Sequence, residues 1–528
     1  MIAADPFTTV VLGVYVIAAF IVPTLAPVAV SDDWTYQRSV EYLINRHEFH
    51  ILPVAAATQI TQLVWGGAFA LVFGVTPGVL RVSTLAIVFL SALALRDMFR
   101  DLGVSNQRAA LGVGLYLFNP IMFAISYSFM SDPHFVAWMT ISAWLYLKAE
   151  VQKRPELNWW ASGVATIACL ERPHGALLPI GVATWYFLSG RLRINRVPVR
   201  SLAAIGLIPA TAMLLLYTVF SHGLPSQQGL FLDEMRAASP TETRLLIERL
   251  AVIEIGYAGF FILPLAIGAF IAIWRALGDL PPAGVRLTVA ATALTAAGMV
   301  WLWAQGKLMP YVPHFFGRGG PGSADLRLAK PALWGTGVFE ALTVACGAAA
   351  VGGLIMCLRA ITHRTQRGQA GIGLVICMLG WQAVGVLPQS FLFRNFTISL
   401  DRYLLPMLPF VVLVAVWAVD DWNLLPILAW PAIAAVALFS IVGTRDVLVL
   451  QNDVWHLAGE LNAAGVPNTR LDAGYAWDAY HLWEFSHANS LAPRTPDGPW
   501  WTTSYAQATD STYVIAAGPI EGYQIISV

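Results

Sequence analysis

Charged residues are scarce in this chain of 528 residues. Only 12% of the residues are Asp, Glu, Lys or Arg, whereas soluble proteins carry about 25%. Hydrophobic residues make up 57% of the chain, and many apolar stretches are long enough to cross about 30 Å of hydrocarbon. The composition therefore excludes a soluble protein. The 31 basic residues balance the 31 acidic ones, so the charge indicates no nucleic-acid partner.

Cysteine is also rare, and several catalytic patterns are missing. The four cysteines lie in or at the ends of apolar stretches, at Cys169, Cys346, Cys357 and Cys377. They are interpreted as small buried hydrophobic residues, not as a disulfide framework or a zinc site. The sequence shows no glycine-rich phosphate loop, no metal-spaced histidine cluster and no internal repeat. No Lys or Arg precedes the first apolar run, so we expect a retained first helix and not a cleaved signal peptide.

Long apolar runs are what the chain has instead. They predict an all-α polytopic membrane protein with about thirteen transmembrane helices. The predicted spans are 7–30, 81–97, 109–129, 133–149, 159–171, 174–189, 201–221, 251–274, 287–304, 335–358, 370–388, 403–419 and 424–441. The apolar segment 53–75 contains several Thr and Gln residues and is predicted to lie at the membrane interface.

Basic residues set the predicted orientation. Four arginines lie between residues 191 and 200, in a short loop that we assign to the cytoplasmic side. An odd number of spans then places the C-terminus outside. We predict a transmembrane domain over 1–441 and a small external α/β subdomain over 442–528. Within the first domain, 31–80 forms an external loop with juxtamembrane helices, and the Gly/Pro-rich loop 305–334 is either a lid or disordered.

Acidic residues stand at two predicted helix ends. Asp32 and Asp33 follow the first span, beside Trp34 and Tyr36, and Asp132 lies between two later spans. Each could simply cap the helix that follows it. Acids at a membrane edge are costly, however, and more often serve a function. If both turns face the same side, three carboxylates border one cavity at the edge of the bilayer.

Cations and aromatic side chains also lie near predicted membrane edges. Pro173 breaks two short spans, with Arg172 and His174 on either side of it. Such breaks often line a wet or enclosed cavity. Other cations on the same predicted side are Lys307, His314, Arg318, Arg394 and Arg402. The aromatic segment 474–483 could stack on a sugar, but packing of the C-terminal part is the favoured interpretation.

These motifs together resemble the GT-C glycosyltransferases, especially the branch with protein O-mannosyltransferases and the lipid A aminoarabinose transferase. The resemblance rests on Asp32-Asp33 after the first span, Phe129-Met130-Ser131-Asp132-Pro133, and Leu170-Glu171-Arg172-Pro173. The segment 53–75, Leu80-Arg81 and the weaker motif Arg402-Tyr403-Leu404-Leu405-Pro406 also fit. The match covers residues 1–200 well and the rest only by topology. Asp33 stands where many relatives have Glu.

The resemblance implies a sugar transfer from a polyprenyl-phosphate donor to an acceptor hydroxyl, usually with inversion. The reaction would occur on the external, periplasmic face of a bacterial inner membrane. The acceptor would be a glycan, a lipid or a protein. By motif position Asp32 is the general base, and Asp33 and Asp132 orient the acceptor or bind a divalent cation, Mg²⁺ or Mn²⁺. Arg172, Arg394, Arg402 and Lys307 hold the donor phosphate. The expected substrate-binding residues are Trp34, Tyr36, His134, His174 and Tyr403.

Three other functions fit part of the pattern. An ion-coupled transporter or flippase also uses acids and broken helices, but its acids usually lie in mid-span and it often has internal repeats. An external polysaccharide polymerase or ligase would share the lipid-linked substrate and use other motifs. A structural assembly subunit would leave Asp32 and Asp132 without a purpose. A passage reaching the inner face would favour the flippase.

Overall fold

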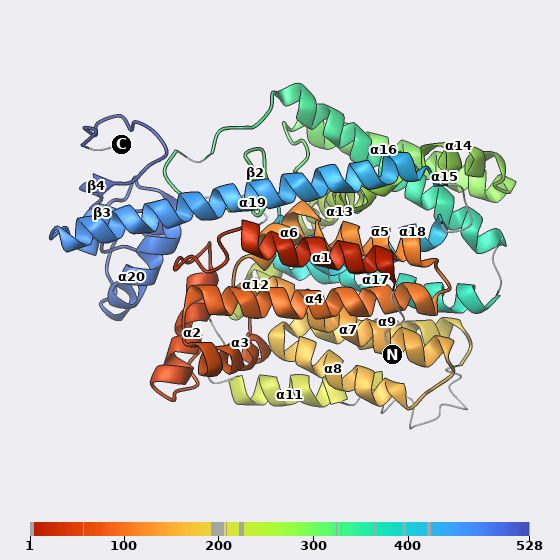
Figure 1. Cartoon of the computed structure of the whole chain (residues 1–528), viewed down its shortest axis with the longest axis horizontal. Coiled ribbons are helices and arrows are strands. Elements are labelled where there is room, and N and C mark those ends of the chain that lie inside the picture. The colour runs from red at the N-terminus through yellow and green to blue at the C-terminus, as the bar shows by residue number, and fades with distance from the viewer. Residues whose placement is uncertain are drawn as a thin grey trace.

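The chain folds into an elongated bundle of helices in a computed structural model (Figure 1). The structure describes residues 5–55, 57–191, 205–206, 208–220, 226–323, 325–328, 330–363, 366–393, 398–419 and 424–526. One large apolar cluster joins helices from both halves of the chain. The prediction of a mostly helical membrane protein is confirmed.

The first part of the chain is built from helices joined by short connections. Their bounds are α1 Pro6–Ile21, α2 Asp33–Asn45, α3 Ile60–Phe73, α4 Pro77–Asp101, α5 Asn106–Leu117, α6 Pro120–Ser126, α7 Ser131–Val151, α8 Leu157–Glu171, η1 Pro173–Ala176 and α9 Leu177–Leu188. Proline stands at the first turn of α1, α4 and α6, where its missing N–H costs no hydrogen bond. Helix α8 ends one residue before Arg172, and Pro173 opens the 3₁₀ turn η1.

The second part holds the longest helices and a small C-terminal unit. Its elements are α11 Ile208–Phe220, α12 Ser226–Ala237, α13 Pro240–Gly268, α14 Phe270–Gly278, α15 Pro282–Ala304, β1 Phe316–Gly317, β2 Gly320–Pro321, α16 Thr336–His363, α17 Gln366–Phe393, η3 Asp401–Met407, α18 Leu408–Ala418, α19 Pro426–Ala463, η4 Asn468–Arg470, β3 Leu471–Asp472, α20 Tyr475–Ala488, α21 Trp500–Ser504 and β4 Tyr513–Val514. Strands β1 and β2 pair antiparallel, whereas β3 and β4 pair parallel.

The predicted number of thirteen spans is not confirmed. Within the described ranges, 7 helices are long and apolar enough to cross a membrane, or up to 8 if the bent pair α5 and α6 is one span. This pair bends by 62° at its break. Helices α1 and α3 are apolar but shorter. Several predicted spans correspond to helices shorter than 18 residues, among them α1 Pro6–Ile21, α8 Leu157–Glu171 and α9 Leu177–Leu188, so they do not enter this count.

Helix α19 connects the bundle to the C-terminal unit. It runs unbroken over 38 residues and leads into α20, α21 and the two short parallel strands (Figure 1). This helix crosses the predicted boundary at residue 442, so the division into two domains stays a prediction. Among the described residues, three small apolar clusters pack this unit, one of them against the start of α2.

Close packing of α13 on α16 provides a test of the bundle. A Cβ at Gly259 would lie 1.8 Å from the carbonyl oxygen of Cys346. We expect Gly259→Ala to lower the free energy of unfolding by about 1–3 kcal/mol, because overpacking moves the two helix backbones apart. Thermal unfolding in detergent micelles measures this change.

Gly380 provides the matched control for this substitution. It also lies in a helix, and a Cβ there meets nothing within 4 Å. Gly380→Ala should therefore be neutral or slightly stabilising. Equal effects of the two substitutions would contradict the packing of α13 on α16.

Candidate active site

A buried arginine fixes the loop between α1 and α2. Arg81 on α4 donates hydrogen bonds to the carbonyl oxygens of Thr24 at 2.5 Å, Ala26 at 3.2 Å and Val28 at 2.9 Å. These bonds satisfy carbonyl groups of an irregular segment, whose backbone has no regular helix or sheet hydrogen bonds. The loop therefore leaves α1 in one conformation and brings Asp32 to the start of α2.

Asp33 joins the two acidic turns to each other. Its carboxylate accepts hydrogen bonds from the backbone N–H of Val30 at 2.7 Å, the amide of Gln37 at 3.0 Å and the backbone N–H of Phe129 at 3.1 Å. Burial raises the pKa of Asp33 to about 7, and Arg81 and the backbone donors oppose this rise. The side chain is fully buried, so it acts as a structural tie between the first loop and the segment before α7.

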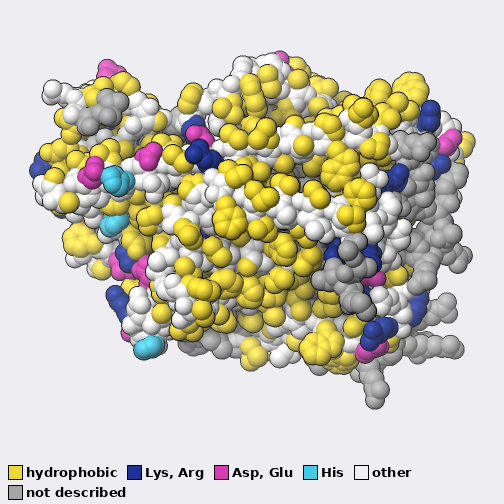
Figure 2. Space-filling model, in the orientation of Figure 1, with side chains coloured by type: hydrophobic (Ala, Val, Ile, Leu, Met, Phe, Trp, Pro, Cys, Tyr) yellow, Lys and Arg dark blue, Asp and Glu magenta, His cyan; other side chains and the backbone are white. Residues whose placement is uncertain are grey.

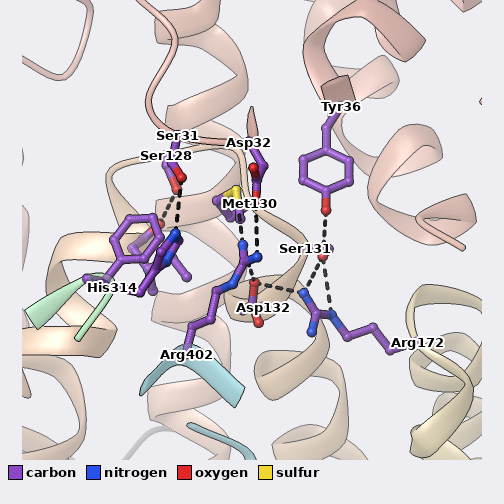
Figure 3. A network of polar contacts seen from close by, with 12 residues as sticks. Ser31, Asp32, Tyr36, Ser128, Met130, Ser131, Asp132, Arg172, His314 and Arg402 are labelled. Atoms are coloured by element: carbon purple, nitrogen blue, oxygen red, sulfur yellow. Dashed lines mark hydrogen bonds and ion pairs between the residues drawn. The ribbon is translucent and has the colours of Figure 1, made fainter. Parts of the chain in front are cut away.

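Two arginines and two aspartates form the centre of the site (Figure 3). Arg402 Nη2 lies 2.9 Å from Asp32 Oδ2, and its Nη1 lies 3.8 Å from Asp132 Oδ2. Arg172 Nη2 lies 2.7 Å from Asp132 Oδ2 and 2.7 Å from the hydroxyl of Ser131. The end of α8 and the starts of α2, α7 and η3 therefore converge on one point.

Asp32 is the carboxylate of this group that remains partly open to solvent. Its side chain is 29% exposed, whereas that of Asp132 is 3% exposed. Its second oxygen accepts a hydrogen bond of 2.7 Å from the hydroxyl of Tyr475 on α20. Burial raises the pKa of Asp32, but the Arg402 guanidinium and the hydrogen bond from Tyr475 oppose burial, and this pKa lies below its ordinary value. Asp32 is therefore ionised at neutral pH.

A long loop closes another side of the site. Asp401 accepts hydrogen bonds from the backbone N–H groups of His314 at 3.1 Å, Phe315 at 3.0 Å and Phe316 at 2.7 Å. This anchor places His314 Nε2 3.4 Å from the hydroxyl of Ser31 (Figure 3). Burial lowers the pKa of His314 to about 3, so its imidazole is neutral. Segment 314–316 of the predicted lid thus lies beside Asp32.

A narrow polar hollow lies beside the two arginines. Its lining includes Asp132, Arg172, His174, Arg402 and Tyr403. The Tyr403 ring centre lies 5.7 Å from the Arg172 guanidinium and 5.2 Å from that of Arg402. The lining of this hollow therefore carries two guanidinium groups and one carboxylate, that of Asp132.

The remaining predicted residues have different surroundings. Trp34 is buried against Trp483 of α20, and the hydroxyl of Tyr36 lies 3.5 Å from that of Ser131. His134 is fully buried and bonds the hydroxyl of Thr84 at 3.0 Å, away from the hollow. Lys307 is half-buried and does not belong to the polar network of Figure 3. Arg394 lies outside the described residues.

Several residues of the site had no assigned role in the sequence analysis. Tyr475 lies in the aromatic segment 474–483, for which packing was favoured over sugar stacking. Ser131 stands inside a recognised motif and Asp401 directly before another, yet hydroxyls and helix-end acids are too common to be selected individually. No local pattern identifies Tyr475, because its partner Asp32 lies 443 residues away in the chain.

The described side chains do not fit a divalent cation. Across the described ranges, no group of three or more His, Cys, Asp or Glu residues has a metal-binding arrangement. Arg402 also lies between Asp32 and Asp132, and its positive charge opposes a cation at that place. No step in the chemistry below therefore uses a metal ion.

The Tyr475 contact predicts a shift in the pH profile. Tyr475→Phe removes a hydrogen bond to the ionised form of Asp32, so the pKa of Asp32 should rise. If Asp32 must be ionised for activity, the acid limb of kcat/KM moves to higher pH, by about 1 unit for a bond of roughly 1.5 kcal/mol. A pH series of kcat/KM measures the shift.

The control for this variant is Tyr523→Phe. It removes another phenol hydrogen bond of the same unit, from Tyr523 to the carbonyl of Ser511. Its acid limb should stay in place. An unchanged limb in Tyr475→Phe would show that the phenol does not tune the carboxylate required for activity.

Comparison with known proteins supports one family. Residues 65–171 match the model of the dolichyl-phosphate-mannose-protein mannosyltransferase family. This match confirms the predicted resemblance and the prediction of a glycosyltransferase. No curated protein matches the chain.

Solved structures of low identity also align with the chain. The structure of ArnT from Cupriavidus metallidurans bound to undecaprenyl phosphate is 15% identical, with a TM-score of 0.43, over 89% of this chain and 82% of that one. The oligosaccharyltransferase AglB from Archaeoglobus fulgidus, in complex with an inhibitory peptide and a dolichol-phosphate, is 12% identical, with a TM-score of 0.42, over 85% and 56%. We draw no functional conclusion from likeness at this level.

Proposed function

We propose that this chain, whose residues 65–171 match the dolichyl-phosphate-mannose-protein mannosyltransferase family, is a membrane enzyme. It would transfer a sugar from a polyprenyl-phosphate donor to an acceptor hydroxyl. The transfer would take place at the membrane edge where α2, α7 and η3 begin, which we assign to the external face. One observation carries the proposal: Arg402 lies between Asp32 and Asp132, with Arg172 on the far side of Asp132.

The two arginines suit the departing phosphate. When the bond between the sugar C1 and the phosphate oxygen breaks, the polyprenyl phosphate leaves with added negative charge. Arg172 and Arg402 line the same hollow and carry fixed charges that stabilise this group without moving far. Because a phosphate is already a good leaving group, no strong general acid is required.

Asp32 suits the role of general base. It is ionised and partly exposed, and it can take the proton from the acceptor oxygen as that oxygen bonds to C1. Attack from the face opposite to the phosphate would invert the sugar. The acceptor hydroxyl has to reach Asp32 Oδ1, the oxygen that now accepts from Tyr475. Tyr475 therefore marks the place of the acceptor hydroxyl.

Asp33 and Asp132 take supporting roles in this proposal. Asp33 holds the two acidic turns together through three protein donors. Asp132 orients both arginines, since each guanidinium lies within 4 Å of its Oδ2 atom. Neither side chain is exposed enough to meet an acceptor directly.

A donor panel tests the proposal. Purified protein in liposomes is supplied with radiolabelled polyprenyl-phosphate hexoses and pentoses, and release or transfer of the sugar is measured. We expect turnover with one donor and retention of the lipid phosphate in the membrane. Movement of an intact lipid-linked sugar across the bilayer, without cleavage of any donor, would contradict the transferase and favour a flippase.

A further inference from the structure

A second polar cavity lies between α2 and α20, outside the hollow beside the two arginines. Its volume is about 200 Å³. It is lined only by polar or charged side chains: Arg38, Glu41, Tyr42, Asn45, Arg46 and Glu484. Figure 2 shows basic and acidic side chains close together at the end of the molecule where α2 and α20 lie.

A hydrogen-bond network holds the cavity wall in place. Arg38 donates to Glu41 at 2.8 Å and to the carbonyl oxygen of Tyr480 at 3.0 Å. The hydroxyl of Tyr480 donates to the other oxygen of Glu41 at 2.9 Å. Across the cavity, the hydroxyl of Tyr42 donates to Glu484 at 2.9 Å. The side chains are therefore oriented before any ligand binds, which lowers the entropy cost of binding.

Parts of the lining remain available to a ligand. The Arg46 guanidinium lies over the Tyr42 ring at 4.3 Å, and no described carboxylate lies within ion-pair distance of it. The side chain of Asn45 is exposed at the end of α2. Arg46 offers N–H donors and Asn45 offers both a donor and an acceptor. The lining therefore offers a ligand both hydrogen-bond donors and a hydrogen-bond acceptor.

The balance of charge indicates the class of ligand. Two guanidinium groups face two carboxylates, so the lining attracts neither a polyanion nor a polycation strongly. An apolar ligand would leave the Arg46 guanidinium and the Asn45 amide without partners. A carbohydrate carries hydroxyls that both donate and accept, so it can pair with the Arg46 guanidinium and the Asn45 amide together. Glycan chemistry therefore fits this cavity best.

The position of the cavity relates it to the candidate base. Asp32 lies at the first turn of α2, and Arg38 to Arg46 follow on the same helix, about 9–21 Å further along its axis at 1.5 Å per residue. Helix α20 has the same arrangement, with Tyr475 on Asp32 at one end and Glu484 in the cavity near the other. Two paired helices therefore connect the cavity to the reacting centre over a distance of several sugar units.

We propose that this cavity binds a distal sugar unit of a glycan acceptor whose terminal hydroxyl reaches Asp32. The proposal rests on the transferase function and specifies its acceptor as an oligosaccharide chain. A short acceptor would engage Asp32 alone, whereas a longer one would also contact Arg46 and Glu484. The enzyme would then prefer acceptors above a minimum length.

Acceptor length provides the test. Mono-, di- and longer oligosaccharides of mannose, glucose, galactose and arabinose are compared as acceptors for wild type, Arg46→Ala and Glu484→Ala. We expect KM for the long acceptors to rise about tenfold in each variant, through loss of hydrogen bonds to a charged group. The values for monosaccharides should not change. Glu460→Ala, an exposed glutamate of α19, is the matched control.

Direct binding separates this inference from the function on which it rests. If wild type turns over no donor, the transferase proposal fails, and saturation-transfer NMR with the same oligosaccharides still tests the cavity. Binding that Arg46→Ala weakens supports the cavity as a glycan site. A KM effect that is equal for all acceptor lengths would overturn the inference. So would competition by peptides and not by oligosaccharides, which would point to a protein acceptor.

Discussion

Asp32→Asn is expected to lower kcat for sugar transfer by about 10³-fold while the protein still folds and binds the lipid phosphate. Removal of a positioned general base typically costs 10²–10⁴-fold. Asparagine has the same shape, and its amide oxygen can accept from either Arg402 or Tyr475. The arginines that line the phosphate hollow remain in place, so the dissociation constant of the donor should change little. Single-turnover transfer and donor binding are measured separately.

Asp97→Asn is the matched control for the loss of a carboxylate. Asp97 is also paired with arginines, and it lies near the C-terminal end of α4. Its side chain is 32% exposed. This variant should keep wild-type kcat. Full activity of Asp32→Asn would show that Asp32 is not the general base. If donor binding falls by the same factor as kcat, Asp32 is a binding residue instead.

Arg402→Met should have the largest effect on stability. It leaves Asp32 without its cationic partner and Asp132 with Arg172 alone. Breaking a buried ion pair by removal of one partner costs about 3–5 kcal/mol, because the remaining charge is uncompensated. Asp32 is partly exposed, so we expect the lower end of this range. Thermal unfolding in detergent micelles measures the change.

A second substitution separates the electrostatic cause from packing. In Arg402→Met combined with Asp32→Asn, the uncompensated carboxylate is gone, and part of the lost stability should return while activity stays low. Arg100→Met is the control for the loss of an arginine. The Arg100 side chain is 41% exposed and lies 4.0 Å from Asp97, so its loss should change the free energy of unfolding by less than about 0.5 kcal/mol. No recovery in the double variant would assign the loss to packing of the arginine stem.

Motif position alone predicts Asp32 as the general base instead of its neighbour Asp33, and the surroundings of the two side chains support this prediction. Asp33 accepts three hydrogen bonds from protein donors and is fully buried. Asp32 turns toward Arg402 and Tyr475 and keeps part of its surface exposed. Adjacent acids in a helix point in different directions, since each residue turns the helix by about 100°. The sequence alone cannot state which direction faces the cavity.

Local sequence patterns predicted the residues whose position depends only on their own segment of the chain. Pro173 ends α8 wherever that helix packs, so the break beside Arg172 followed from proline chemistry. The position of Asp132 at the start of α7 followed in the same way from the apolar run behind it. The number of spans stays a prediction, because hydropathy reports apolar length and does not show where a helix begins and ends within an apolar run.

The sequence by itself determined a helical membrane protein whose motifs resemble those of a glycosyltransferase family, with acids and an arginine at particular helix ends. These features depend on composition, apolar run length and short motifs, all of which are local. Only the tertiary structure brought Arg402 between Asp32 and Asp132, placed Tyr475 on Asp32 and paired α2 with α20. These contacts join residues about 270 to 443 positions apart. Their partners are chosen by the packing of whole helices, and no spacing in the chain records that choice.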